Sequence, residues 1–457
     1  MAMASTADDL SVLHELRQRL AATASRTRRL DAYYDGAQRL AALGLGLPPE
    51  MRRLQVVVNW PRLTVDSLAE RLDLEGFRLA GAAETDERLW SWWQANGLDD
   101  ESGLAHLEAL ITGRAYITVG PGDDGADTPV ITPESARSMI ADVDPRTRAV
   151  RSALRLYTSR SGGELSATLY LPDRTVYYDR GRSGWRVVDL IAHKLGRVPV
   201  VPLINRARIG DRHGRSEMDD VIGLTDAACR TMTNLGGAQE LLAVPQRYVL
   251  GAGRSDFVNE AGEPIPAWEA YIGRILALGN ENAKVGQFAA ADLRNFVEVV
   301  NLYARLVAAL SGLPPHFLGL STDNPASADA IRSGETRLVK RAERRARAFG
   351  SAWEESMRLG MLIVDGEIPP HAARLESIYR DPATPTYAAK ADAVSKLVAS
   401  GILPISAAWE ELGYSAEQRR KLAAASGDDP LARLLDTVGA GRTGGLELPA
   451  APAVGDR

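Results

Sequence analysis

The chain has 457 residues, of which 45% are hydrophobic and 25% charged, as in ordinary globular domains. Its net charge of −5, from 54 basic and 59 acidic residues, excludes a simple basic clamp, so contact with DNA must come from local patches. The single cysteine, Cys229, excludes an intramolecular disulfide and a cysteine-rich zinc site. The length suits two or three ordinary domains or one elongated subunit with several parts.

The amino terminus has no basic start followed by an apolar core, so we expect no secretory signal. No stretch approaches the roughly 18 apolar residues that a membrane span requires. We therefore expect a soluble protein that is cytoplasmic at synthesis.

The first half of the chain predicts helices followed by strands. To about residue 73, apolar residues recur at intervals of three and four, which indicates helices before and after Pro61. Phe77–Leu79 predicts a short strand, and the Asn96-Gly97 turn separates two further helices from each other. AYITVG predicts a strand. Between residues 129 and 203, short alternating runs parted by Gly, Asp and Pro predict an antiparallel β region of several strands.

Helices return in the second half. Ser216 is expected to cap a helix that runs to about residue 243, and PQRYVLGAG then predicts a strand before a segment rich in loops. A further helix ends at Pro314-Pro315, and a long one restarts after Ser327, its expected N-cap. At roughly 35 residues this long helix would extend about 50 Å. Its predicted apolar seam consists of Ile331, Leu338, Ala342, Phe349, Trp353, Met357 and Met361.

The carboxyl-terminal part predicts two helices and a tail. The helices cover residues 387 to 425 and are divided by Gly401 to Pro404. Beyond them the sequence is mainly Gly, Ala and Pro with little to bury, so we expect residues 426–457 to be disordered.

Signatures of catalysis are absent from the sequence. We find no GxxxxGK[ST], HExxH, GxSxG or CxxC motif. The acidic pairs Asp99-Asp100, Asp123-Asp124 and Asp219-Asp220 could hold Mg²⁺ for phosphoryl chemistry, but turns or helix starts explain them better. The six histidines are scattered singly, which favours surface or capping roles. We therefore predict no catalytic residue, no cofactor and no metal site.

Two clusters allow a structural and a nucleic-acid interpretation. Trp90, Trp92 and Trp93 could stack on bases, but a helix anchored in a core is the better interpretation. The long helix carries a basic run that wraps around more than one face. Its members are Arg332, Arg337, Lys340, Arg341, Arg344, Arg345 and Arg347. They either pair with acids of a neighbouring helix or subunit, or they approach DNA phosphates. The residues alone indicate a helical, non-enzymatic assembly protein.

The order of these parts resembles the portal (head–tail connector) proteins of tailed double-stranded DNA bacteriophages, in the branch common among phages of actinobacteria. The resemblance covers about residues 10 to 420. Its most specific stretches are VPVVPLINRARIGDRHGRSEMDDVIGLTDAACRTMTN, AVPQRYVLG and LSGLPPHFLGLSTDNPASADAIRSGETRLVKRAERRARAFGSAWEESMRLGMLI. Each is diffuse as a motif, but their order and spacing together carry the resemblance.

The resemblance implies an α+β, mainly helical portal fold with an antiparallel β region and a small α/β clip, assembled as a ring of usually about twelve subunits. The implied parts are a wing (1–213), stem helix one (214–243), a clip (244–291), stem helix two (292–312), a tunnel loop (313–327), the long helix with the rest of the wing (328–386), a crown (387–425) and the tail (426–457).

The same resemblance implies three groups of site residues. In the tunnel loop, DNA would pass Pro314, Pro315, His316, Phe317, Ser321, Thr322, Asp323 and Asn324. The clip would dock a head-completion adaptor through Arg254, Asp256, Phe257, Trp268 and Tyr271. Ring contacts would involve Arg337, Lys340, Arg341, Arg344 and Arg345. Residues 312–327 contain no lysine or arginine, which suits a wall that passes DNA without gripping it. We hypothesise that the long helix serves the ring contact more than DNA.

The implied function is a channel at one capsid vertex, through which the terminase packages DNA and from which DNA is later ejected. Implied partners are other copies of the chain, double-stranded DNA, the terminase, major capsid and scaffold proteins and the head-completion adaptor, with no membrane. The implied location is the virion, and the host cytoplasm during assembly. Two alternatives stay open: a magnesium-dependent nucleic-acid-processing enzyme, and a helical adaptor that forms no ring, from a prophage or gene-transfer particle.

Overall fold

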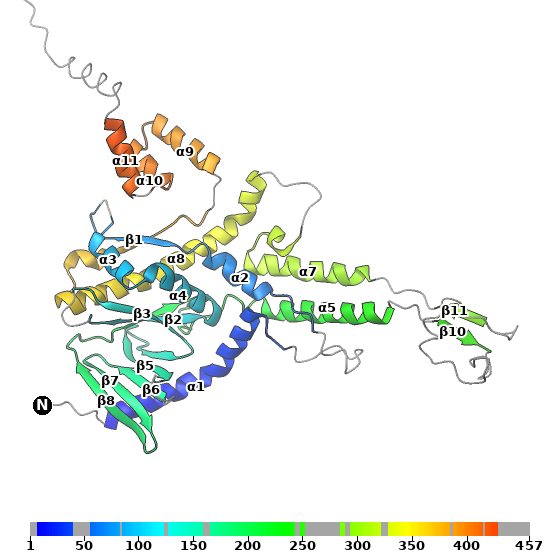
Figure 1. The fold of residues 1–457 in the computed structure, drawn as a ribbon, viewed down its shortest axis with the longest axis horizontal. Helices are drawn as coiled ribbons and strands as arrows, with labels where there is room; N and C mark the ends of the chain where they lie inside the picture. Colours follow the sequence, from blue (N-terminus) through cyan, green and yellow to red (C-terminus); the bar gives the residue numbers. More distant parts are fainter. Residues whose placement is uncertain are drawn as a thin grey trace, which may run out of the picture. The chain divides into compact units, whose positions relative to one another are not determined.

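The structure is a computed structural model that describes residues 7–39, 55–82, 85–122, 127–158, 165–242, 247–251, 284–287, 293–320, 328–383, 387–414 and 416–427. It divides into two compact units, Met1–Pro382 and Ala383–Arg457. Helices combine with antiparallel sheets, as the sequence predicted (Figure 1). Within the described ranges, no helix has the length and apolar character needed to cross a membrane.

The first part of the chain alternates helices and strands. The helix α1 covers Ala7–Asp35, and α2 (Trp60–Ala69) begins after Asn59, whose side chain accepts a hydrogen bond from the Arg62 amide at 3.3 Å. The next elements are β1 (Leu74–Arg78), α3 (Glu87–Ala95), α4 (Leu98–Thr112), β2 (Arg114–Gly120), β3 (Val130–Ser135), β4 (Met139–Val143), β5 (Val150–Thr158), β6 (Leu165–Tyr170), β7 (Arg174–Gly181), β8 (Gly184–Ala192) and β9 (Val200–Ile204). The predicted helices and the β region are thus confirmed, whereas β4 was not predicted.

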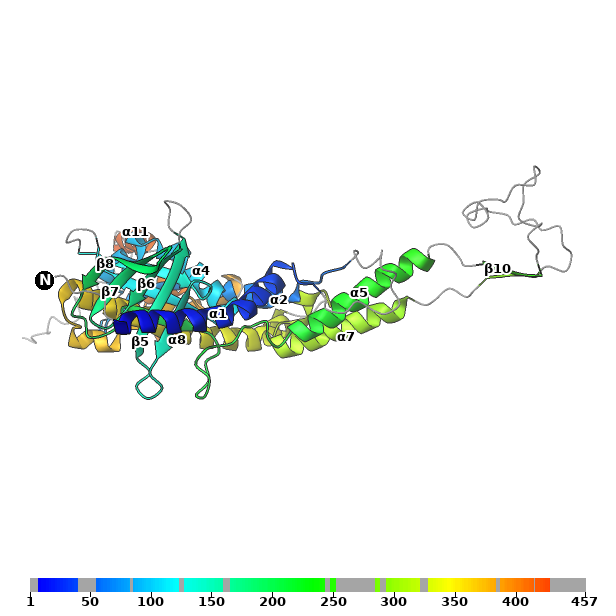
Figure 2. The same ribbon diagram turned by 90° about the horizontal axis from the view of Figure 1, so that it is seen from below.

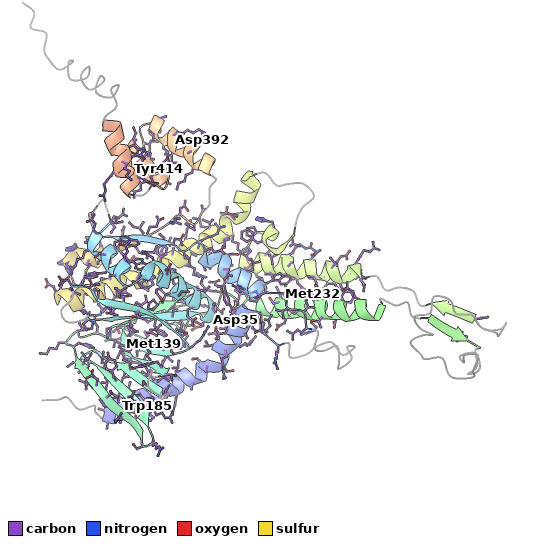
Figure 3. All side chains as sticks on the ribbon, in the orientation of Figure 1. Asp35, Met139, Trp185, Met232, Asp392 and Tyr414 are labelled. Carbon is purple, nitrogen blue, oxygen red and sulfur yellow. The ribbon has the colours of Figure 1, made fainter. Side chains whose placement is uncertain are left out.

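These strands form two antiparallel sheets. One has the order β4-β5-β6-β7-β8, and the other has the order β3-β2-β9. Pro133 lies in β3 and Pro202 in β9, the two edge strands of the smaller sheet, where a missing amide breaks no ladder between inner strands. Met139, labelled in Figure 3, is fully buried in the cluster that joins the two sheets.

The main core gathers around the long helix α8 (Ala328–Asp365). The predicted seam is confirmed for Leu338, Ala342, Phe349, Trp353, Met357 and Met361, which are all less than 5% exposed. Trp93 packs edge-on against Trp353, with ring centroids 4.9 Å apart, so the core interpretation of the tryptophans is also confirmed. The 3₁₀ helix η5 (Pro370–Arg374) follows, and β12 (Glu376–Tyr379) then pairs with β1. A separate cluster buries α1 against the five-stranded sheet.

A pair of helices leaves this core. The helices α5 (Ile222–Leu242) and α7 (Arg294–Ser311) lie side by side in both views (Figures 1 and 2). The prediction that the first helix begins at Ser216 is wrong. The Ser216 hydroxyl accepts a hydrogen bond from the Met218 amide at 3.1 Å in a local turn, and further turns delay the helix to Ile222.

Beyond α5 lies a small antiparallel pair of strands. The predicted strand β10 (Arg247–Leu250) is confirmed and pairs with β11 (Lys284–Gln287). The second strand was not predicted within this segment rich in loops. After α7 comes the 3₁₀ helix η4 (Pro315–Leu318).

The described part of the second unit contains three helices where two were predicted. They are α9 (Tyr387–Ala399), α10 (Ile405–Glu411) and α11 (Ala416–Gly427). The division between Gly401 and Pro404 is confirmed, because α10 begins directly after Pro404. The second predicted helix is interrupted at Gly413, whose φ of 88° lies in the left-handed region. The predicted disordered tail falls mostly after residue 427, outside the described residues.

Candidate functional site

The end of α7 explains the break that the two prolines predict. Gly312 takes φ 71°, and its amide donates to the Ala308 carbonyl at 2.9 Å, which closes the helix. Leu313 is then 4% exposed in the main core. Phe317 and Leu318 of η4 pack partly against the same core. The first half of the predicted loop is therefore fastened to the body of the first unit.

The candidate loop residues divide into two groups. Pro314 is buried, Phe317 is half-buried, and Pro315 and His316 are exposed. The other four fall outside the described residues; they are Ser321, Thr322, Asp323 and Asn324. Residues 313–320 contain no lysine or arginine. The described part of the loop thus offers a surface without positive charge.

The basic run of α8 binds the core-facing end of the helix pair, where α5 starts and α7 ends. Arg337 Nη1 donates to the Ala309 carbonyl in the last turn of α7 at 2.6 Å. Arg341 and Arg345 both bind Glu217, a fully buried carboxylate that precedes α5, and Arg345 Nη2 lies 2.7 Å from Glu217 Oε1. Burial alone would raise the pKa of Glu217, but the Arg345 and Arg341 guanidiniums outweigh it and hold the pKa below its usual value. The carboxylate is therefore ionised at neutral pH.

The other two candidates for a ring contact are exposed. Lys340 Nζ lies 2.8 Å from Glu343 Oε2, one turn along the same helix. Arg344 is exposed and makes no hydrogen bond or ion pair with the part of the chain that the structure describes. Of the five candidates, four bind groups of their own chain, and Arg344 stays available to another molecule. The ring contact itself remains a prediction.

A close backbone crossing fixes the position of Glu217. Gly113 follows α4 with φ 98°, and Gly214 crosses it with φ 76°. A Cβ on Gly214 would lie 2.0 Å from the Gly113 carbonyl oxygen, so only glycine fits. The Glu217 amide then donates to the Leu110 carbonyl at 2.9 Å. Sequence analysis missed both Glu217 and this crossing, and the only available signal was a glycine within each of the motifs TGRAY and RHGRSE.

The predicted docking residues of the clip cannot be placed. Arg254, Asp256, Phe257, Trp268 and Tyr271 all lie between β10 and β11, outside the described residues. Their role therefore stays a prediction.

Two of the three acidic pairs take part in structural contacts. Asp219 binds Arg26 at 3.0 Å, and Asp99 accepts a hydrogen bond from Trp93 Nε1 at 3.0 Å. Asp123 and Asp124 fall outside the described residues. Among the residues that are described, no group of three or more His, Cys, Asp or Glu side chains could hold a metal ion.

One histidine departs from the sequence prediction. His106 is 1% exposed in the main core, not on the surface. Its Nε2 accepts a hydrogen bond from Trp353 Nε1 at 2.9 Å, and its ring stacks on Phe349 with centroids 5.1 Å apart. Burial lowers the pKa of His106 to about 4, so the imidazole is neutral at physiological pH. Its place on a helix among apolar residues was the only sequence signal.

Known proteins match this chain over most of its length. A family model described as phage portal protein, SPP1 Gp6-like, matches residues 13–423. The portal proteins of Mycobacterium phages L5 and D29 are each 42% identical over 402 residues, which cover 86% of this chain and 83% of theirs. Two solved structures, a virion of a native gene transfer agent particle and a neck of an empty one, match at 14% identity with TM-scores of 0.45 and 0.47. They cover 84% and 85% of this chain, and 99% and 98% of their own.

Proposed function

The chain belongs to the phage portal protein family, and we propose from this membership that its copies close into a ring around a channel for DNA at one capsid vertex. The match over residues 13–423 is the observation that carries this proposal. Portal proteins are structural components of the virion, which favours this function over a magnesium-dependent enzyme and over an adaptor that forms no ring.

The distribution of charge supports a channel that does not grip DNA. Residues 313–320 contain no lysine or arginine, and three basic residues of α8 bind groups of their own chain. Each phosphate neutralised by a fixed cation would add affinity and salt dependence, which would oppose sliding. We therefore assign the channel wall to the loop 313–327, including Pro315 and His316 in its described part.

The remaining parts of the proposal follow the portal architecture. Residues 1–213 and 328–386 form the wing, α5 and α7 the stem, residues 244–291 the clip and residues 387–425 the crown. The clip docks the head-completion adaptor, and Arg344 contributes to the contact between subunits. The ring contains about twelve copies. Its further partners are the terminase, the major capsid protein and the scaffold protein.

Mass photometry of the purified full chain tests this function, followed by two-dimensional class averages from cryo-electron microscopy. We expect closed rings of about twelve subunits with a central channel. A monomer at every concentration would contradict the portal function and favour the adaptor. Magnesium-dependent cleavage of DNA by the purified chain would support the enzyme.

A further inference from the structure

One face of α7 carries large apolar side chains that are exposed. They are Val299, Leu302, Leu306 and Leu310, with exposed fractions between 38% and 51%. At about 100° per residue, intervals of three, four and four place them within roughly 80° of the helix circumference. We call these four residues the apolar ridge. The opposite face of the helix is the one that packs against α5, through Ala304 and Val307.

The outward face of α5 has the complementary shape. Gly223, Ala227, Thr231 and Asn234 line it, and all four are exposed or half-exposed. A Cβ at Gly223 would meet no atom within 4 Å in the described part of the chain. We call these four residues the small-residue groove. It points away from the buried Ala228 and from Cys229, whose sulfur accepts a hydrogen bond from the Val58 amide at 3.2 Å.

The two surfaces match in spacing and in height. The groove residues follow intervals of four, four and three, which is the spacing of the ridge in reverse order. The chain leaves along α5 and returns along α7, so the two helices run antiparallel (Figures 1 and 2). Ala228 of α5 and Ala304 of α7 share one buried cluster, so these two residues lie at the same height along the helix pair. The ridge and the groove of one subunit therefore lie at the same height.

We propose that the apolar ridge of one copy packs into the small-residue groove of a second copy. Large side chains on one helix fill the space that small side chains leave on another, which is the usual basis of close helix packing. Exposed Arg230 borders the groove and exposed Glu298 borders the ridge, so the rims of the two surfaces carry opposite charges.

This inference rests on the proposed ring. The ridge and the groove are different surfaces of the same subunit, so their contact is head-to-tail and repeats from copy to copy until it closes. A ridge meeting another ridge would instead give a two-fold dimer. Every subunit carries one ridge and one groove, which leaves neither surface uncovered in a closed ring.

Disulfide cross-linking between copies tests the contact. The variant Ala227→Cys with Leu306→Cys places one thiol in the groove and one on the ridge, at matching heights. The natural Cys229 is buried and is present in every control. After oxidation of rings of the full chain, we expect a ladder of covalent oligomers on a non-reducing denaturing gel. Each single variant should stay monomeric on the same gel.

Two outcomes would overturn the inference. One is covalent dimers from Leu306→Cys alone, which would show that ridge meets ridge. The other is rings of the double variant without a ladder, which would place another surface, such as a different segment of the chain, over the ridge. Both leave the proposed function intact. Failure of the natural chain to form any ring would contradict the function itself.

A charge on the ridge gives an independent measurement. Leu306 is exposed, so Leu306→Glu should leave the melting temperature of the subunit unchanged. We expect it to raise the concentration needed for ring formation at least tenfold. The matched control is Val188→Glu, which places the same charge at an apolar residue of β8 that is 55% exposed. Rings of Leu306→Glu at the concentration of the natural chain would overturn the proposal.

Discussion

At the residue scale, Glu217 decides how the helix pair is attached to the core. Its carboxylate is fully buried between Arg341 and Arg345, which come from α8 more than a hundred residues later in the chain. Both guanidiniums are themselves mostly shielded, with 18% and 13% of each side chain exposed. Removing the carboxylate would leave two shielded cations without their counter-charge, which costs more than the net contribution of the intact group.

We therefore predict that Glu217→Gln lowers the free energy of unfolding by about 3 to 5 kcal/mol. The matched control is Glu343→Gln, which removes the half-exposed partner of the exposed Lys340 on the same helix. An exposed pair one turn apart contributes about 0.5 kcal/mol or less. Urea denaturation followed by tryptophan fluorescence measures both. Equal losses in the two variants would contradict a special role for the buried group.

The buried His106 predicts how stability depends on pH. Its pKa is lowered to about 4 in the folded chain, chiefly by burial, against about 6.5 in an unfolded one. Between these values the unfolded state binds more protons at this residue, so the free energy of unfolding falls as the pH falls. Above about pH 6.5 His106 is neutral in both states and does not make the free energy of unfolding depend on pH. By about pH 4, its preference for the unfolded state lowers the free energy of unfolding by roughly 3 kcal/mol.

Comparison with His106→Gln isolates this contribution. Gln cannot titrate, but its side-chain oxygen can still accept the hydrogen bond from Trp353 Nε1. We expect urea denaturation at several pH values from 7.5 to 4 to show a shallower decline for the variant than for the natural chain. Parallel declines would mean that carboxyl groups alone set the pH dependence. His106 would then have no part in it.

At the scale of elements, local patterns predicted helices well and their long-range contacts poorly. The apolar seam of α8 was predictable because its spacing of fours and sevens repeats from Leu338 to Met361 within a helix of 38 residues. The start of α5 was not predictable from local pattern. Ser216 accepts a hydrogen bond within a turn, and the Glu217 amide donates to the Leu110 carbonyl, so the helix does not start at Ser216 despite the capping preference of serine. The five-residue strand β4 was missed, since its burial comes from the neighbouring sheet and leaves little local signal.

Two glycines of α8 allow a matched test of how β12 packs on this helix. A Cβ on Gly350 would lie 2.2 Å from Ser377 Oγ, whose hydrogen bond to Glu354 Oε1 at 2.9 Å opposes a shift. We predict that Gly350→Ala lowers the free energy of unfolding by about 1 to 3 kcal/mol.

The control lies in the same helix. A Cβ on Gly334 meets no described atom within 4 Å, so Gly334→Ala should raise the free energy of unfolding by up to about 1 kcal/mol through helix propensity. Thermal unfolding of the two variants beside the natural chain measures both effects. A rise in the free energy of unfolding in both variants would show that helix propensity, not packing against β12, decides the effect of the added methyl group.

At the scale of the whole molecule, the sequence shows where basic residues are absent, but it does not show which groups the basic residues bind. The absence of lysine and arginine from residues 313–320 is visible in the sequence itself. The partners of the basic run are not visible in the sequence, because Arg337 binds the end of α7 and Arg341 and Arg345 bind Glu217, which are distant in the sequence from α8. The prediction that basic residues pair with acids of a neighbouring segment is correct in kind, but the acid, Glu217, was not among the predicted residues.

The proposed channel can be tested by adding the charge that it lacks. Pro315 and His316 are the exposed residues of η4, so Pro315→Arg with His316→Arg should leave the fold intact while adding two cations to every subunit. We predict that rings of this variant bind linear duplex DNA more tightly than rings of the natural chain. The affinity should fall more steeply between 50 and 200 mM salt, because each phosphate contact releases counterions.

The topology of the DNA separates the channel from the outer surface. A closed ring can be threaded by a linear duplex but not by a nicked circular one, so the gain should be confined to the linear form in an anisotropy or gel-shift titration. Leu104→Arg is the control, since it adds a cation at an exposed residue of α4, outside the proposed channel. We expect it to affect both forms of DNA equally. If the η4 variant gains affinity equally for linear and circular DNA, Pro315 and His316 lie on the outside of the ring. Only the inside of a closed ring distinguishes a duplex with ends from one without.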